Sequence, residues 1–476
     1  MIDFLAQDAT ALAAMVACGD VAPTELLEAA LAKVASLNPA LNAVVLVQEA
    51  VARAAISTGL PRGRFRGLPF LLKDLGCEAV DFPSHNGSRL LANTHYSADS
   101  TIYARIRATG VVTFGRTTAP EGGIGAATEA AVYGGPTRNP WSLEHTSGGS
   151  SGGAGAAVAA GIVPFAHGTD GGGSVRIPAS NCGLFGFKPT RARLPDGPFA
   201  GEGWAGMSID GFLTRSVRDT AFMLDACAGP DLGAPYAAPP LAKSHADAIS
   251  RPPRRLRIAI CDTNFTGQAI HPEVAQAVRA AGHLLESLGH HLTPARPKAD
   301  VAMMMRAWTD IGAVGTALSI RSALHGRPLT DDLVEGVGRG ALAHAETLSP
   351  LRYLQAVGEI HAFGRAMAAA FSDYDILLSA TLAEPPAKVG RFGHTTTDYL
   401  DYRTGPKGIF AYSPFCAIFN ASGQPAASLP LAMSKDRLPI GIHLAAPYGC
   451  DEDLIALCAE LELAQPWAAR RPPHVA

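Results

Sequence analysis

HTSGGSSGGAGAA at residues 145–157 is followed, after a short apolar run, by GTDGGGSVRIPAS at residues 168–180. Glycines surround the serines so closely that the backbone must adopt conformations that residues with side chains disfavour. Ser150 and Ser174 lie 24 positions apart within these two stretches. We expect the two stretches to shape the functional site and the rest of the chain to hold them in place.

Three uses of a glycine-rich loop can be compared with the first stretch. A phosphate-binding P-loop requires G-x-x-x-x-G-K-[ST], and no lysine follows these glycines. A Rossmann fingerprint requires G-x-G-x-x-G, but Val158 stands where the third glycine belongs. Residues 148–152 do match G-x-S-x-G, the nucleophile elbow of a Ser-His-Asp α/β hydrolase. That alternative stays open, although it explains neither the second stretch nor Lys73, a lone charge in the apolar run LPFLLKDL.

Taken together, Lys73 and the two stretches resemble the amidase signature family. LPFLLKD is similar to its lysine motif, SGGSSGGAGAAVAAG to its signature block, and GTDGGGSVRIPASNCGLFGFKPTR to its nucleophile block. The segments IDGFLTRSVRD, FNASGQPAASLPLAM and LPIGIHL then follow in the family's order, so the motifs span residues 68–444. The resemblance implies the amidase signature fold, an α/β structure in which a large mixed β-sheet is layered by α-helices (α/β/α).

The resemblance also implies a Ser-Ser-Lys triad, with Ser174 as nucleophile, Ser150 as bridging serine and Lys73 as base, and a cis peptide bond between Gly149 and Ser150. A serine hydroxyl is a weak nucleophile until a neighbour accepts its proton. Ser150 could pass that proton to a neutral Lys73 amine and return it to the departing nitrogen. Burial in an apolar strand should lower the pKa of Lys73, and strand alternation should send Asp74 to the opposite face.

The residues beside the nucleophile are expected to support it. Asp170 and Arg176 flank the loop and should pair to fix it. His167 and Cys182 are expected to be structural, although His167 lies close enough in sequence to suggest a Ser-His pair. The oxyanion hole is assigned to the N–H groups of the three residues before Ser174, which are Gly171, Gly172 and Gly173.

Composition narrows the class of protein further. Apolar residues make up 47% and charged residues 17% of the chain, which is typical of a folded globular enzyme. The net charge of −3 leaves no basic field for nucleic acid or an anionic membrane. Eight cysteines form no C-x-x-C pair and have no histidine at zinc-ligand spacing, so neither a metal nor another cofactor is expected. The N-terminus lacks a signal-peptide pattern, which predicts a cytoplasmic enzyme. The expected partner is a small-molecule amide substrate, and a homodimer is possible.

The end-to-end resemblance, together with the mixed order of predicted strands and helices, implies a single amidase signature domain over 1–476. Residues 1–60 are expected to form an N-terminal helical arm, 67–220 the signature core with the triad, and 256–476 the remaining sheet with the substrate-selecting helices and loops. Strands are predicted at LPFLLKDL, VVTFG, LRIAICD, DILLSATL, PAASLPLAM and LPIGIHLAAP. Long helices are predicted at residues 8–37, 272–289, 352–371 and 452–464.

Within the family, the runs DATALAAM, HGRPLTDDLVE and PWAARRP resemble 6-aminohexanoate cyclic dimer hydrolases. The predicted function is therefore hydrolysis of apolar linear or cyclic amides, such as that dimer, through an acyl-enzyme. An aryl acylamidase or a carbamate hydrolase shares the triad, and so would a glutaminase subunit of an amidotransferase, which needs a partner protein. Segments 300–345 and 385–415 are expected to supply an apolar acyl pocket, with candidates Met303, Met304, Met305, Trp308, Ile311, Val314, Phe410, Tyr412 and Phe415.

Overall fold

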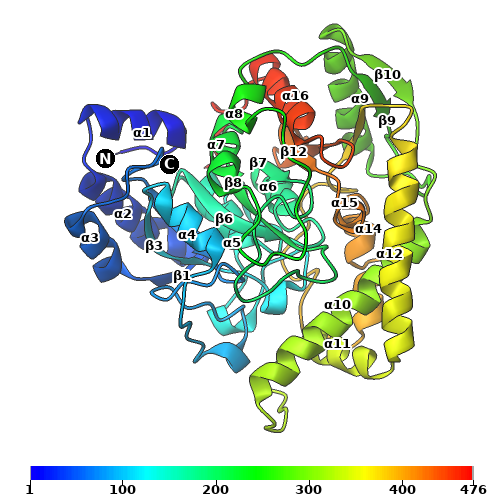
Figure 1. Cartoon of the computed structure of the whole chain (residues 1–476), viewed down its shortest axis with the longest axis horizontal. Coiled ribbons are helices and arrows are strands. Elements are labelled where there is room, and N and C mark those ends of the chain that lie inside the picture. The colour runs from blue at the N-terminus through cyan, green and yellow to red at the C-terminus, as the bar shows by residue number, and fades with distance from the viewer. Residues whose placement is uncertain (1, 474–476) are drawn as a thin grey trace.

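A computed structural model describes residues 2–473 (Figure 1). In these residues eleven strands form one mixed sheet, in the order β1-β3-β2-β6-β8-β7-β12-β13-β11-β9-β10. A separate hairpin joins β4 (Arg138–Asn139) and β5 (Ser142–Thr146). The strands of the large sheet are, in the same order, Val44–Val47, Val112–Thr117, Pro69–Lys73, Phe165–Asp170, Ile209–Thr214, Phe185–Lys188, Ala426–Met433, Pro439–Ala445, Ile376–Ala380, Arg257–Ile260 and His291–Pro294.

The direction of the strands decides where their polar ends meet. β2 runs parallel to β3 and to β6, and at the other end of the sheet β9 runs parallel to β10 and β11. The strands between these two groups are antiparallel. Because β2 and β6 are parallel neighbours, Lys73 and Asp170, their last residues, lie at the same edge of the sheet.

Helices pack on this sheet, which confirms the predicted α/β class (Figure 1). α5 contacts β2, β3, β6 and β8, and α6 contacts β7, β12 and β13. The predicted long helices are present as α1, α2, α9, α12 and α16. The helices are α1 Ala9–Cys18, α2 Pro23–Leu41, α3 Glu49–Thr58, α4 Thr101–Ala108, α5 Gly152–Ala159, α6 Arg176–Cys182, α7 Val217–Cys227, α8 His245–Ala248, α9 Pro272–Ser287, α10 Val301–Leu324, α11 Gly336–Glu346, α12 Pro350–Ala370, α13 Tyr399–Thr404, α14 Ile409–Tyr412, α15 Cys416–Ser422 and α16 Asp451–Ala464.

The first sixty residues do more than form a helical arm. They also supply β1, which pairs antiparallel with β3 and so extends the main sheet. The two ends of the chain lie side by side (Figure 1). Arg471 pairs with Asp3 at 2.6 Å, and Arg215 donates to the carbonyl oxygens of Leu5 and Ala468.

The glycines of the first stretch are required by packing. A Cβ atom on Gly153 would lie 2.4 Å from the backbone nitrogen of Thr118 and 2.6 Å from the carbonyl oxygen of Ala43. Gly152 has the same constraint, because its Cβ would lie 2.3 Å from Thr128 Oγ1. The start of α5 therefore approaches the neighbouring backbone more closely than any other residue type allows.

We predict opposite effects for two glycine-to-alanine changes in helices. Gly153→Ala should lower the free energy of unfolding by about 1–3 kcal/mol, because the new methyl group meets backbone atoms that cannot move away. Gly358→Ala, in α12, should raise it by up to about 1 kcal/mol, because nothing lies within 4 Å of the new Cβ and alanine is the better helix former. Chemical denaturation of both variants measures the difference, and a stabilising Gly153→Ala would contradict the packing argument.

Candidate active site

Lys73 is buried at the end of β2, and its amine has two hydroxyl partners. Nζ lies 2.7 Å from Ser150 Oγ and 2.7 Å from Thr169 Oγ1. Thr169 comes from β6, so the parallel pairing of β2 and β6 brings it beside the lysine. The carboxylate of Asp74 lies on the opposite side, where it accepts hydrogen bonds from the backbone N–H of His85 and the hydroxyl of Tyr133.

Burial sets the charge state of this amine. Burial lowers the pKa of Lys73 to about 7, although the carboxylates of Asp170 and Asp210 raise it. A substantial fraction of the amine is therefore neutral near pH 7, and a neutral amine can accept a proton. Desolvation therefore lowers the pKa of Lys73 more than nearby carboxylates raise it, as predicted. The opposing carboxylates are those of Asp170 and Asp210 rather than that of Asp74.

Ser150 and Ser174 both line one cleft of about 570 Å³. The peptide bond between Gly149 and Ser150 is cis, as predicted. The backbone N–H of Ser151 donates to the carbonyl oxygen of Ser174 at 3.2 Å, which ties the two glycine-rich stretches together. The cleft therefore contains both serines, and Ser150 connects it to the buried lysine.

Asp170 and Arg176 form a fully buried pair below the loop of Ser174. Arg176 Nη2 lies 2.8 Å from Asp170 Oδ1, and Arg176 Nε lies 3.0 Å from Oδ2. Burial alone would raise the pKa of Asp170, but the guanidinium of Arg176 holds it well below its usual value. Asn420, from α15, completes the network by donating to the backbone and carboxylate of Asp170 and accepting from Arg176.

The glycines before Ser174 are not equivalent. The N–H of Gly173 donates to Asp170 Oδ1 at 2.8 Å, so it is directed at the carboxylate. This corrects the prediction for Gly173, whose sequence position could not reveal that Asp170 folds back onto it. Gly171 lines the cleft, and a Cβ atom on Gly172 would lie 3.0 Å from the ring of Trp308. The N–H groups of Gly171 and Gly172 remain the candidates for an oxyanion hole.

The α/β-hydrolase alternative needs a histidine as the base, and the geometry favours the lysine instead. His167 is buried, with Nε2 2.7 Å from Asp210 Oδ1, while Nδ1 accepts the backbone N–H of Lys73 at 3.3 Å. Burial lowers the pKa of His167. It therefore positions the end of β2, in the structural role that the sequence predicted. Cys182 is buried, and its thiol donates to the carbonyl oxygen of Ser147.

The predicted segment 300–345 does line the cleft, but the nine residues predicted for the apolar pocket were wrong. None of its nine apolar candidates lines the cleft in the described part of the chain, because most of them fill the core around α10. Trp308, for example, packs edge-on against Trp204 and Phe410 and donates its indole N–H to the carbonyl oxygen of Gly171. α10 reaches the cleft further along the chain, through Gly315, Leu318 and Ser319.

The cleft is more acidic than the sequence suggested. Four carboxylate side chains are among its lining residues, which within residues 2–473 include no lysine, arginine or histidine. Burial, together with the nearby carboxylates of Asp210, Asp231, Glu202 and Glu78, raises the pKa of Asp196 to about 8. The acidic lining residues are Glu78, Asp196, Glu202 and Asp210.

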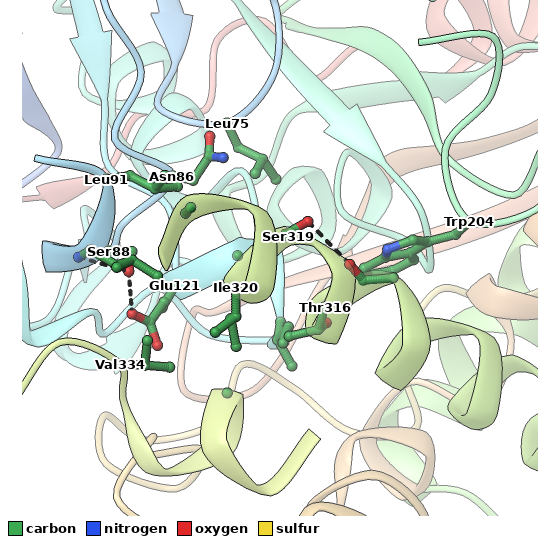
Figure 2. Close-up of a pocket in the computed structure, with 16 residues that line it drawn as sticks. Leu75, Asn86, Ser88, Leu91, Glu121, Trp204, Thr316, Ser319, Ile320 and Val334 are labelled. Carbon is green, nitrogen blue, oxygen red and sulfur yellow. Dashed lines mark hydrogen bonds between the residues drawn. The ribbon is translucent and has the colours of Figure 1, made fainter. Parts of the chain in front are cut away.

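A smaller cavity of about 90 Å³ adjoins the cleft (Figure 2). Its walls are mostly apolar, and Glu121 is the carboxylate among them. The residues that line both spaces are Leu75, Asn86, Gly122, Trp204, Gly315 and Ser319.

The sequence analysis missed Arg116, which holds the segment after Lys73. Its fully buried guanidinium donates to the carbonyl oxygens of Phe82, Lys73, Gly76 and Cys77. The sequence pattern could have indicated this role, because Arg116 is a lone charge in the apolar run VVTFGRT, as Lys73 is in LPFLLKDL. Thr169 and Asn420 carried no comparable signal, since neither residue type is unusual in its local sequence.

The mixed α/β sheet and a buried lysine that contacts one of the two serines in the cleft point to an amidase. The family model for Amidase matches residues 25–455, and the chain belongs to this family of hydrolases that act on carbon–nitrogen bonds. The chain is 38% identical to the 6-aminohexanoate-cyclic-dimer hydrolase of Paenarthrobacter ureafaciens, over 98% of this chain and 96% of that protein.

Solved structures agree with the sequence comparison. A 6-aminohexanoate cyclic dimer hydrolase complexed with substrate superimposes with a TM-score of 0.92, at 35% identity over the full length of both chains. A bacterial aryl acylamidase of the amidase signature family matches with a TM-score of 0.85 at 28% identity, over 98% of this chain and 99% of that one. None of the helices in residues 2–473 combines the length and apolarity needed to span a membrane.

The burial of Lys73 predicts a pH-dependent contribution to stability. Its folded-state pKa of about 7 lies below the ordinary value of 10.5, so between these two pH values the unfolded chain binds more protons. The free energy of unfolding should therefore rise with pH in this window, by about 1.4 kcal/mol per unit of pKa difference. Urea titrations of Lys73→Met should show a smaller rise than wild type, because the buried Lys188, whose pKa burial also lowers to about 7, still contributes in this window. Lys435→Met, at an exposed position, should keep the full rise. The full wild-type slope in Lys73→Met would mean that Lys73 does not contribute to it.

Proposed function

We propose that this amidase hydrolyses its substrate through a covalent acyl-enzyme, with Ser174 as nucleophile, Ser150 as proton relay and Lys73 as base. The observation that carries the proposal is the 2.7 Å contact between Lys73 Nζ and Ser150 Oγ, made by a buried amine whose pKa is about 7. A neutral amine at this distance can take the hydroxyl proton of Ser150 as Ser150 takes that of Ser174.

The proton then travels back along the same path. Ser174 Oγ attacks the amide carbon, and the carbonyl oxygen becomes an oxyanion for which the N–H groups of Gly171 and Gly172 are the proposed donors. Ser150 returns a proton to the nitrogen as the carbon–nitrogen bond breaks, so that a neutral amine leaves. Water then attacks the Ser174 ester by the same relay and releases the acid.

Proposed substrates are linear or cyclic amides, with 6-aminohexanoate cyclic dimer as the first candidate because of the similarity to hydrolases of that name. Aryl acylamides are the second candidate, supported by the acylamidase relatives. Carbamates remain an untested alternative. A glutaminase subunit is less favoured, because the carboxylates that line the cleft would repel the free carboxylate of glutamine.

Covalent catalysis predicts labelling at one serine. A fluorophosphonate should add its mass to a single tryptic peptide that contains Ser174, and Ser174→Ala should lose both labelling and hydrolysis of the cyclic dimer, an anilide and a carbamate. Mass spectrometry and product analysis of wild type and variant measure this. Labelling at Ser150 would instead identify Ser150 as the nucleophile.

The role of Lys73 predicts the pH profile. The kcat/KM of the free enzyme should rise with pH through a midpoint near 7, because the base must be neutral and its pKa is about 7. Lys73→Met should lose most of the activity, by roughly 100-fold or more, together with this limb. Lys73→Arg should not restore either, because a guanidinium stays protonated. Near wild-type turnover in Lys73→Met would exclude the lysine as base.

A further inference from the structure

The small cavity beside the cleft is shaped to receive a narrow apolar group. It shares Trp204 and Gly315 with the cleft, and these two residues pack so closely that a Cβ atom on Gly315 would lie 2.7 Å from the Trp204 ring. Figure 2 shows that Trp204 and Glu121 lie on opposite sides of the cavity. The apolar residues of its walls include Leu75, Leu91, Ile124, Ile320, Ala323 and Val334.

Glu121 places a buried carboxylate in this apolar space. Only 7% of the residue is exposed, and Figure 2 shows its side chain between Ser88 and Val334. Oε1 accepts the hydroxyl of Ser88 at 2.6 Å, and Oε2 accepts the backbone N–H of Glu335 at 2.7 Å. A carboxylate has about four acceptor sites, so these two bonds leave acceptor capacity on both oxygens.

The charge of Glu121 is not balanced by a contacting cation. The described residues that line the cavity include no lysine, arginine or histidine. Burial raises the pKa of Glu121, and the nearby carboxylate of Glu335 raises it further, while His394 lowers it. Buried charges in proteins are normally paired. A cation that entered the cavity would supply the missing partner.

The cavity is also close to the proposed catalytic residues. Glu121 and Gly123 belong to one short 3₁₀ turn, and a Cβ atom on Gly123 would lie 3.5 Å from Ser150 Oγ. Two trans peptide units span at most about 7.6 Å between Cα atoms, so the backbone of Glu121 lies within that distance of Gly123, the residue beside Ser150.

We propose that this cavity binds an aminoalkyl arm of the substrate, with methylene groups against the apolar walls and the terminal ammonium on Glu121. This inference rests on the proposed function of the cleft and narrows its substrate class to linear amides of ω-amino acids, because a cyclic dimer has no free ammonium to bind Glu121. The acidic residues of the outer cleft other than Asp196, which is mostly uncharged near pH 7 because its pKa is about 8, favour the same class, since their field attracts a cationic substrate and repels an anionic one.

Two anilides that differ only in the terminal group test the inference. Wild type should hydrolyse 6-aminohexanoyl p-nitroanilide with a kcat/KM about tenfold or more above that of hexanoyl p-nitroanilide, because the ammonium gains a charge-assisted hydrogen bond. Glu121→Gln should remove most of this preference. Glu129→Gln is the matched control, since Glu129 also accepts a backbone N–H, that of Gly390, but does not line the cavity, and it should keep the preference.

A binding measurement separates this inference from the proposed function. In Ser174→Ala, calorimetry should find n-hexylammonium bound about tenfold more tightly than 1-hexanol, and adding Glu121→Gln should abolish the difference. Charge-dependent binding without hydrolysis of either anilide by wild type would contradict the proposed function and support the cavity assignment. Hydrolysis with the same substrate preference in Glu121→Gln would overturn the cavity assignment alone.

A second variant covers the case in which Glu121 only holds the fold together. Ala323→Leu narrows the cavity without touching Glu121, and it should lower kcat/KM for both six-carbon anilides relative to acetyl p-nitroanilide. Ala302→Leu, at an exposed position of the same helix, should not. A lower melting temperature of Glu121→Gln with equal losses on both anilides, and no effect of Ala323→Leu, would show a structural role and overturn the inference.

Discussion

The rest of this structure depends on one constraint, which is that the amine of Lys73 stays buried away from water. Lys73 lies at the end of a strand whose residues are all buried, and its two side-chain partners are the hydroxyls of Ser150 and Thr169. Neither hydroxyl carries a charge that would fix the proton on the amine. Desolvation therefore outweighs the more distant acids, and the lysine can act as a base near neutral pH.

The scaffold around the lysine serves to keep that arrangement. Parallel pairing of β2 with β6 brings Lys73 and Thr169 to one edge of the sheet. Arg116 binds four carbonyl oxygens of the segment around and after Lys73, so that this segment covers the lysine without leaving its own backbone unpaired. On the other side, the buried network of Asp170, Arg176 and Asn420 fixes the loop of Ser174.

The proposed selection of the substrate depends on parts of the chain that are remote from these motifs. The cleft and its side cavity are closed by α10, by the loop that carries Trp204 and by the 3₁₀ turn of Glu121. Their chemistry differs from that of the catalytic core, because carboxylates and aliphatic side chains replace hydroxyl groups and glycines. In the proposed mechanism the core cleaves the amide bond, and these outer residues select which amide reaches it.

The sequence by itself determined the family, the class of fold, most of the strands and long helices, and the residues of the proposed triad. These features depend on local patterns, such as a lone lysine in an apolar strand or glycines beside a serine, which folding does not alter. Only the tertiary structure decided that Gly173 donates to Asp170, that Trp308 and its apolar neighbours fill the core, and that Glu121 and four other acids face the substrate spaces. An apolar side chain has the same pattern whether it lines a cavity or fills a core, and a carboxylate looks the same in sequence whether it faces solvent or a cleft. Their roles depend on contacts between segments that are far apart in the chain.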